Sequence, residues 1–190
     1  MSLAPLLPES TVLVMIDIQE RLAPAMDVAS FARVVANGAL LLDTAKTLDV
    51  PVLATEQYPK GLGHTISDFA SRLLERGVAP IEKVAFDACA EPAFARALEA
   101  VNPKAAVLFG METHVCIFQT ARSLAAKGIA TYVVSDAVAS RRDAHRLQGL
   151  SLCEHAGAVA IPAESVVFDW MKIAGTEAFR TISKMVRNVP

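Results

Sequence analysis

Short apolar runs rich in β-branched residues alternate with longer amphipathic segments along the whole chain. The run at residues 11–18 is almost continuously apolar, which is typical of a strand buried on both faces. Residues 31–49 carry apolar side chains at three- and four-residue spacing, which predicts a helix. Further strands are predicted at residues 51–57, 80–86, 104–110, 129–136 and 158–162, and further helices at 66–77, 91–101, 114–128, 141–157 and 176–188. Because strands that alternate with helices of this length build βαβ units, the sequence predicts an α/β three-layer sandwich with a mainly parallel central sheet.

The length of 190 residues fits one domain spanning residues 1–190, and no linker or internal repeat interrupts the pattern. Hydrophobic residues make up 53% of the chain, and the mean hydropathy of +0.39 is high. Charges, glycines and prolines nevertheless break each apolar run well before the ~18 residues that a membrane helix needs. We therefore expect no membrane segment, and we expect the surplus apolar surface to form an interface in a homo-oligomer.

The net charge of −2 comes without a cluster of basic residues, so the sequence predicts no binding of nucleic acid or of an anionic membrane. The first ten residues lack the basic and apolar regions of a signal peptide. Cys89, Cys116 and Cys153 are an odd number of cysteines without the spacing of a disulfide framework, and we expect them to be free thiols. A cytoplasmic location is the corresponding expectation.

Polar residues follow the predicted strands at their carboxyl ends, where ligands bind in open parallel sheets. Asp17 closes the first run, Gln57 closes the second, and the segment 110–116 follows the strand at 104–110. Lys83 lies in or beside the short strand at 80–86. The site is therefore expected at this edge of the sheet.

Cys116 is a candidate nucleophile, although a lone cysteine on an apolar helix face is more often buried filler. A free thiol has a pKa near ~8.5, so its proton must be removed or its pKa lowered. A position in the first turn of a helix would favour the thiolate. Asp17 as a general base, with cationic Lys83 beside it, is the second device. A dyad of Cys116 with His114 is disfavoured, because residues two apart on a helix face different ways.

Three motifs together resemble one known family: VMIDIQ at the first strand, EKVAFDA around Lys83, and GMETHVCIFQTA around Cys116. In this order and spacing the chain resembles the isochorismatase-like cysteine hydrolases, which include nicotinamidase and N-carbamoylsarcosine amidohydrolase. The stretches TEQYPKGLG and FDWMKIAGTEAFRTI are similar to the subgroup of isochorismatase domain-containing proteins. The resemblance covers nearly the whole chain.

The resemblance implies that Asp17 is the general base and acid, Lys83 its cationic partner and Cys116 the nucleophile. It also implies an oxyanion hole made by the backbone N–H groups of Glu112 and Cys116, with a cis peptide bond between Met111 and Glu112. Each such donor can contribute ~3 kcal/mol to lowering the barrier. The implied reaction is hydrolysis of a small amide-like or carbamoyl substrate through a thioester.

The chain departs from two members of the family. Nicotinamidases hold a metal with an Asp-x-His cluster, whose spacing Glu56 and His64 do not reproduce, so we expect no metal. Enzymes that cleave isochorismate lack the cysteine, so Cys116 argues against that reaction. No cofactor motif is present, since the GLG turn near Leu62 is too short for a phosphate loop.

The pocket and the overall function each leave alternatives open. Gln19, Gln57, Tyr58 and Phe86 are candidate substrate-binding residues. Gln19 could equally orient Asp17 or cap a turn, loop polarity explains Gln57 and Tyr58, and a core role explains Phe86. Instead of an enzyme, the chain could be a silent oligomeric scaffold or a thiol-based redox protein with Cys89 or Cys153 as resolving thiol.

Overall fold

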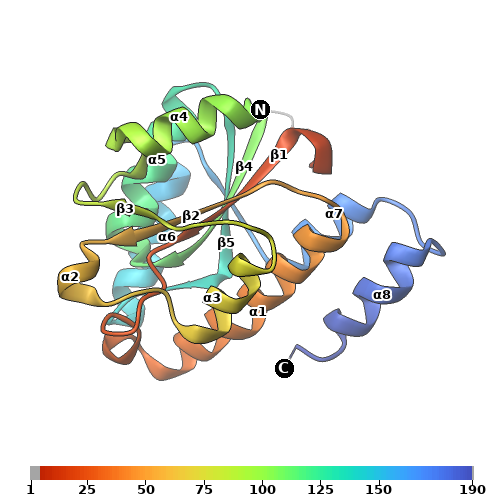
Figure 1. Ribbon diagram of the computed structural model, residues 1–190, viewed down its shortest axis with the longest axis horizontal. Helices are drawn as coiled ribbons and strands as arrows, with labels where there is room; N and C mark the ends of the chain where they lie inside the picture. The colour runs from red at the N-terminus through yellow and green to blue at the C-terminus, as the bar shows by residue number, and fades with distance from the viewer. Residues whose placement is uncertain (1–4, 190) are drawn as a thin grey trace.

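The computed structural model describes residues 5–189 and arranges six strands in one sheet, with every pair parallel. The strands lie in the order β3-β2-β1-β4-β5-β6 (Figure 1). They are β1 (Thr11–Ile16), β2 (Val52–Gln57), β3 (Ile81–Lys83), β4 (Ala105–Met111), β5 (Ala130–Ala139) and β6 (Val159–Ile161). The prediction of a parallel α/β sandwich is confirmed.

Helices connect the strands and cover both faces of the sheet (Figure 1). The helices are α1 (Val28–Thr47), α2 (Pro59–Leu62), α3 (Ser67–Leu74), α4 (Pro92–Val101), α5 (Phe118–Ala126), α6 (Asp143–His155), α7 (Ala163–Met171) and α8 (Glu177–Val186). Helices α1, α3, α7 and α8 share one apolar cluster, and α4, α5 and α6 share the other.

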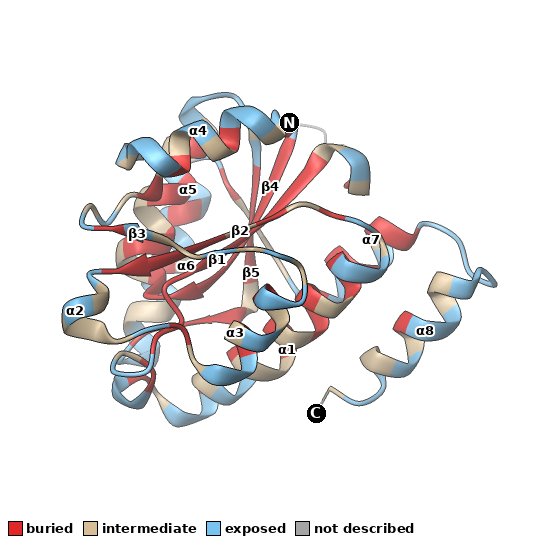
Figure 2. Ribbon diagram, in the orientation of Figure 1, coloured by how far each residue is buried: buried red, intermediate tan, exposed pale blue. Residues whose placement is uncertain are grey.

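The strand β1 shows why its sequence is apolar at every position. Leu13 and Met15 point into the cluster with α1, whereas Val12, Val14 and Ile16 point into the cluster with α5. Successive side chains of a strand face opposite sides of the sheet, so a strand covered on both sides has no polar face. Figure 2 shows the central strands as the buried middle layer.

The order in which the strands are added reverses between β1 and β4. From β1 the chain builds β2 and β3 on one side of the sheet, and it later builds β4, β5 and β6 on the other. Such a reversal leaves space outside the carboxyl ends of the two central strands, where ligands bind in open α/β sheets. Asp17 follows β1 and Cys116 follows β4 by five residues, so the fold brings both residues to this edge.

Gly110 allows β4 to approach β1 closely near the carboxyl ends of the two strands. Its φ is +123°, and a Cβ added there would lie only 2.1 Å from the carbonyl oxygen of Ile16. Any larger residue would push β4 away from the strand end that carries Asp17.

Several element boundaries differ from the predicted ones, among them the start of α1, the end of β5 and the start of α5. Helix α1 begins at Val28 because the Asp27 side chain accepts a hydrogen bond from the Ser30 N–H and caps it. Strand β5 continues to Ala139, three residues beyond its predicted end, and its pairing with β4 is irregular between Leu108 and Gly110. The predicted helix from residue 114 begins as a π-helical turn, Thr113–Ile117, before α5.

Two segments left without a helix in the sequence analysis are helical. Residues 59–62, which overlap the GLG turn near Leu62, form the single turn α2, and residues 163–171 form α7. Helix α1 is long and apolar enough to cross a membrane by length and composition alone, contrary to the expectation from its interrupted apolar runs. Half of that apolar window is buried within the fold, against β5 and α7, as in the core helix of an α/β sandwich.

Candidate active site

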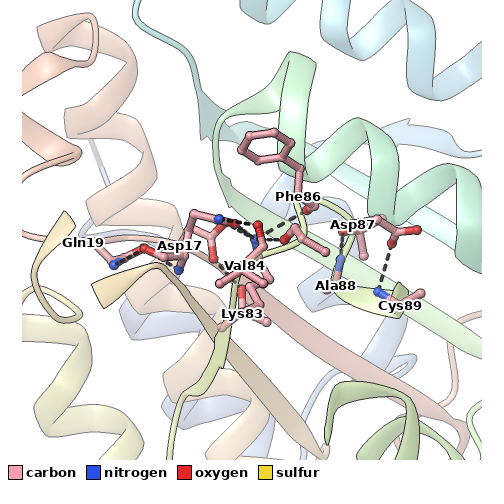
Figure 3. Close-up of polar contacts among 12 residues, drawn as sticks. Asp17, Gln19, Lys83, Val84, Phe86, Asp87, Ala88 and Cys89 are labelled. Carbon is pink, nitrogen blue, oxygen red and sulfur yellow. Dashed lines mark hydrogen bonds and ion pairs between the residues drawn. The ribbon is translucent and has the colours of Figure 1, made fainter. Parts of the chain in front are cut away.

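A buried ion pair between Asp17 and Lys83 lies at the carboxyl edge of the sheet (Figure 3). Asp17 follows β1 with a left-handed backbone, φ 52°, and Lys83 is the last residue of β3. The Asp17 Oδ2 lies 2.7 Å from the Lys83 Nζ, and neither side chain is exposed to solvent. The Asp17 carboxylate is therefore committed to this pair and does not cap a helix.

Every polar atom of this pair has partners from the protein. Asp17 Oδ1 accepts a hydrogen bond of 2.7 Å from the Thr55 hydroxyl. Lys83 Nζ donates to Gln57 Oε1 at 2.7 Å, and to the carbonyl oxygens of Ala85 and Phe86 at 3.3 and 3.4 Å. Burying two charges is tolerable only when the remaining donors and acceptors are satisfied in this way.

The sequence analysis missed Thr55 and the two carbonyls. One signal for Thr55 was present: it lies two residues before Gln57 on β2, and alternate residues of a strand share a face. Every residue has a backbone carbonyl, so the sequence cannot indicate which carbonyl oxygens contact Lys83. The contacts of Ala85 and Phe86 could be identified only in the structure.

Cys116 lies in the π-helical turn that follows β4 and is 6% exposed. The pKa of its thiol is raised to about 12, and burial is the largest cause. The Asp17 carboxylate contributes to this rise by its charge and through a side-chain hydrogen bond, whereas the Lys83 ammonium opposes it by the same two means. The three side chains therefore interact directly, although they come from three separate parts of the chain.

Cys116 lies in the first turn of the helix, as predicted, because the π-helical turn Thr113–Ile117 continues directly into α5. The predicted lowering of its pKa is wrong, because burial has the largest effect and raises the pKa. At neutral pH the thiol keeps its proton. A nucleophilic reaction at this sulfur therefore needs a base, and Asp17 is the carboxylate within hydrogen-bond reach.

The segment before Cys116 contains the two groups implied for the oxyanion hole. The peptide bond between Met111 and Glu112 is cis. The carbonyl oxygen of Glu112 accepts hydrogen bonds from the N–H groups of Val115 and Ile117, which close the turn around Cys116. The Glu112 side chain accepts from the backbone N–H and the Nε of Arg141 at 3.0 and 3.1 Å. Glu112, at the start of the turn, is thus held through both its backbone and its side chain.

Gln19 and Gln57 are buried, and their amides bond within the protein rather than toward an open pocket. Gln19 Nε2 donates to the carbonyl oxygens of Gln57 and Gly63, and Gln19 Oε1 accepts from the Gln57 N–H. Gln57 Nε2 donates to the carbonyl oxygen of Val84. Protein groups thus occupy both amides, which does not support their predicted contact with substrate.

Tyr58 and Phe86 are both about half exposed. Tyr58 lines a cavity of about 300 Å³ together with Lys83, Val84 and Glu91. Figure 3 shows the Phe86 ring turned away from Lys83, although its carbonyl oxygen accepts from the ammonium. The alternative of a core role for Phe86 does not fit its exposure.

The histidines have partners other than the nucleophile. His114 Nδ1 lies 3.0 Å from the Ser140 hydroxyl, and its ring centroid is 4.8 Å from that of His145. His64 Nδ1 lies 3.0 Å from Glu56 Oε2. Within residues 5–189, no group of three or more His, Cys, Asp or Glu side chains is arranged to hold a metal ion.

Comparison with known proteins gives one consistent result. The model of the isochorismatase domain matches residues 11–165. Isochorismatase domain-containing protein 2A of Mus musculus is 35% identical over 187 residues, which are 98% of this chain and 87% of that protein.

Solved structures agree with this match. The MAR1 ribonuclease from Caenorhabditis elegans has a TM-score of 0.90 and 30% identity, covering 98% of this chain and 95% of that one. The YcaC gene product from Escherichia coli, an octameric hydrolase of unknown specificity, has a TM-score of 0.85 over 97% of this chain and 92% of that one, and at 19% identity it supports the fold alone. The domain match runs from β1 into α7 and takes in Asp17, Lys83 and Cys116, so the chain belongs to the isochorismatase family.

Proposed function

We propose that the protein is a cysteine hydrolase that cleaves the C–N bond of a small amide-like or carbamoyl substrate. Membership of the isochorismatase family supports a hydrolase-type function. The observation that carries the finer proposal is the buried Asp17–Lys83 pair, with both charges acting on the Cys116 thiol. A carboxylate beside a protonated thiol is the arrangement that a base-assisted nucleophile needs.

In the first half of the proposed reaction, the Cys116 sulfur attacks the substrate carbonyl carbon while Asp17 takes the thiol proton. A tetrahedral intermediate forms with negative charge on the former carbonyl oxygen. The backbone N–H groups of Glu112 and Cys116 are the proposed donors to this oxygen. When the C–N bond breaks, Asp17 gives its proton to the leaving nitrogen, and a thioester remains on Cys116.

In the second half, a water molecule attacks the thioester carbonyl and Asp17 takes a proton from it. The C–S bond then breaks, the acid product leaves, and the proton on Asp17 returns to the sulfur. Lys83 stays charged throughout and stabilises both the carboxylate and the developing thiolate. Each half-reaction leaves the Asp17–Lys83 pair ready for the next.

A second candidate activity comes from a relative. The Caenorhabditis elegans structure at 30% identity is titled a ribonuclease. Against RNA as the substrate here stands the net charge of −2, since phosphate backbones are bound by clustered Lys and Arg. RNA is therefore included as a competing substrate in the test described below.

The scaffold and redox alternatives have less support. A silent scaffold has no need of a buried ion pair that acts on a thiol. A redox protein would need a second, resolving thiol. Cys89 and Cys153 are free, but burial raises the pKa of each to about 12, so neither forms a thiolate readily at neutral pH.

The test is turnover of a panel of small amides, carbamoyl compounds and RNA by the wild type, by Cys116→Ala and by Cys153→Ala. Cys153 is a matched control because it is also a buried thiol, placed on α6. Cys116→Ala is expected to lower turnover of an amide by about a thousandfold or more, with Cys153→Ala close to wild type. Intact mass after acid quenching should show an acyl adduct only when Cys116 is present. Equal turnover by Cys116→Ala would refute the proposal.

A further inference from the structure

The ammonium of Lys83 is held by an oxygen from a side chain that the proposed reaction does not use. Gln57 Oε1 lies 2.7 Å from Lys83 Nζ, the same distance as the Asp17 carboxylate. The two backbone carbonyls that complete the shell are longer contacts, at 3.3 and 3.4 Å. Gln57 is therefore the closest neutral partner of the cation.

The sheet register places Gln57 beside Lys83. The two residues are Cα partners on the parallel strands β2 and β3, so their side chains leave the same face of the sheet side by side. Thr55 lies two residues earlier on β2 and donates to Asp17 from the same face. One face of the β2 end thus supplies a partner to each member of the ion pair.

The orientation of the Gln57 amide is fixed by its other end. Its Nε2 donates to the carbonyl oxygen of Val84 at 2.8 Å, so its oxygen is the atom that faces the ammonium. Figure 3 shows Gln19, Asp17, Lys83 and Val84 near one another, with the contact between Lys83 and Asp17 among its dashed lines. A reversed amide would place two sets of N–H donors against each other.

The backbone of Gln57 is held as firmly as its side chain. Gln19 forms a two-way contact with it, accepting from its N–H at 2.8 Å and donating to its carbonyl oxygen at 3.0 Å. The same Gln19 amide also donates to Gly63 at 2.6 Å and so ties the segment after β2 to the strand end. Gln57 is 9% exposed, and Gln19 is fully buried.

We propose that Gln57 is a positioning residue that keeps the Lys83 ammonium against Asp17 and Cys116, with Gln19 holding Gln57 in place. A neutral amide suits this position because it accepts a hydrogen bond from the cation without adding a charge. A second carboxylate there would compete with Asp17 for the same ammonium. This inference rests on the proposed function, since Lys83 acts there by stabilising the carboxylate and the thiolate.

The test measures the rate of iodoacetamide labelling at Cys116 by peptide mass, in the wild type, Gln57→Met, Gln57→Glu and Lys83→Met. Gln148→Met is the matched control, because Gln148 is exposed on α6. Lys83 lowers the pKa of the thiol, so its loss should slow labelling. Gln57→Met should slow labelling by about tenfold, the size expected for loss of a hydrogen bond to a charged group. Gln57→Glu should also slow it, because a further negative charge near the sulfur disfavours the thiolate.

The outcomes separate this inference from the proposed function. If Gln57 contacts substrate instead, Gln57→Met should label like the wild type and raise KM while Lys83→Met labels slowly, which would overturn the inference alone. If Lys83→Met also labels at the wild-type rate, the proposed function fails with it. Rapid labelling of buried Cys153 would reveal a Gln57→Met protein that fails to fold. Gln57→Asn, which keeps a neutral amide but is too short to reach Lys83, then decides by the same two outcomes.

Discussion

At the scale of single residues, the site depends on how one buried thiol keeps or loses its proton. Burial and the Asp17 charge hold the pKa of Cys116 near 12, and Lys83 opposes them. The resting thiol therefore keeps its proton at neutral pH. In the proposed reaction, Asp17 accepts this proton and Lys83 faces the new negative charge.

The pH dependence of Cys116 labelling follows from the sign of that shift. A pKa raised to about 12 means that the thiolate fraction of the wild type keeps rising about tenfold per pH unit from neutral to strongly alkaline pH. An ordinary thiol, with a pKa near ~8.5, would level off well before that. The measurement is the iodoacetamide rate at Cys116 across this range. A plateau of the labelling rate near pH ~9 would show that the pKa of the Cys116 thiol is not raised.

Asp17→Asn should separate labelling from turnover. The variant removes the charge that raises the pKa of Cys116 and leaves Lys83 to lower it, so labelling at a fixed pH should become about tenfold faster for each pKa unit lost. Turnover should nevertheless disappear, because no group remains to move the proton. The control is Asp43→Asn, a change to a partly exposed carboxylate on α1. Slower labelling together with normal turnover would contradict the assigned role.

At the scale of elements, the site depends on how closely the turn carrying Cys116 is packed. Helix α6 crosses this turn at Gly149, where an added Cβ would lie 2.7 Å from the backbone nitrogen of His114 and 2.8 Å from the carbonyl carbon of Thr113. Gly110 fixes the opposite side through its contact with Ile16. Two glycines thus allow the close packing around the turn that carries Cys116.

Gly149→Ala should therefore reduce turnover more than it reduces stability. The new methyl group forces α6 or the turn to shift, at a cost of about 1–3 kcal/mol in the free energy of unfolding. Turnover should fall by about a hundredfold, because small misplacements of a reacting group have effects of that size. Denaturant unfolding and kcat are the two measurements, and Gln148→Ala on the same helix is the control. Wild-type kcat in Gly149→Ala would show that the turn tolerates the shift.

At the scale of the whole molecule, large apolar side chains lie exposed at the same edge of the sheet as the site. Tyr58 and Val84 line one cavity, and Phe86 follows two residues later; all three are more than half exposed. Exposed apolar groups gathered in this way are typical of an interface. An interface at this position would account for part of the high hydrophobic fraction of the sequence.

We expect the protein to assemble with copies of itself through this patch of Tyr58, Val84 and Phe86. Its molar mass in solution, measured by sedimentation equilibrium, should be a multiple of 20.2 kDa. Phe86→Glu should shift the mass toward that of one chain, whereas Ile173→Glu, at another exposed apolar position, should not. A wild-type mass of one chain would contradict the expectation, and an unaltered Phe86→Glu oligomer would place the interface elsewhere.

The sequence predicted those elements that depend on a local pattern of side chains. It did not predict the boundaries and turn geometry that depend on contacts between distant segments. The apolar runs predicted every strand, because a strand buried on both faces leaves the same mark wherever it occurs. The end of β5 was placed three residues early, since the continuation depends on an irregular pairing with β4. The turn at Thr113–Ile117 reads as an ordinary helix in sequence, and its π-helical form depends on the packing of α6.

The sequence alone predicted the parallel sandwich, because its strands and helices alternate in a recognisable pattern. It also predicted that Asp17, Lys83 and Cys116 meet at the carboxyl edge, because they follow or end predicted strands and lie in three recognisable motifs. Only the tertiary structure decided that the Cys116 thiol is held protonated and that Gln57 faces Lys83 rather than an open pocket. Both depend on burial and on the register between neighbouring strands. These properties arise from segments far apart in sequence, and no single segment contains them.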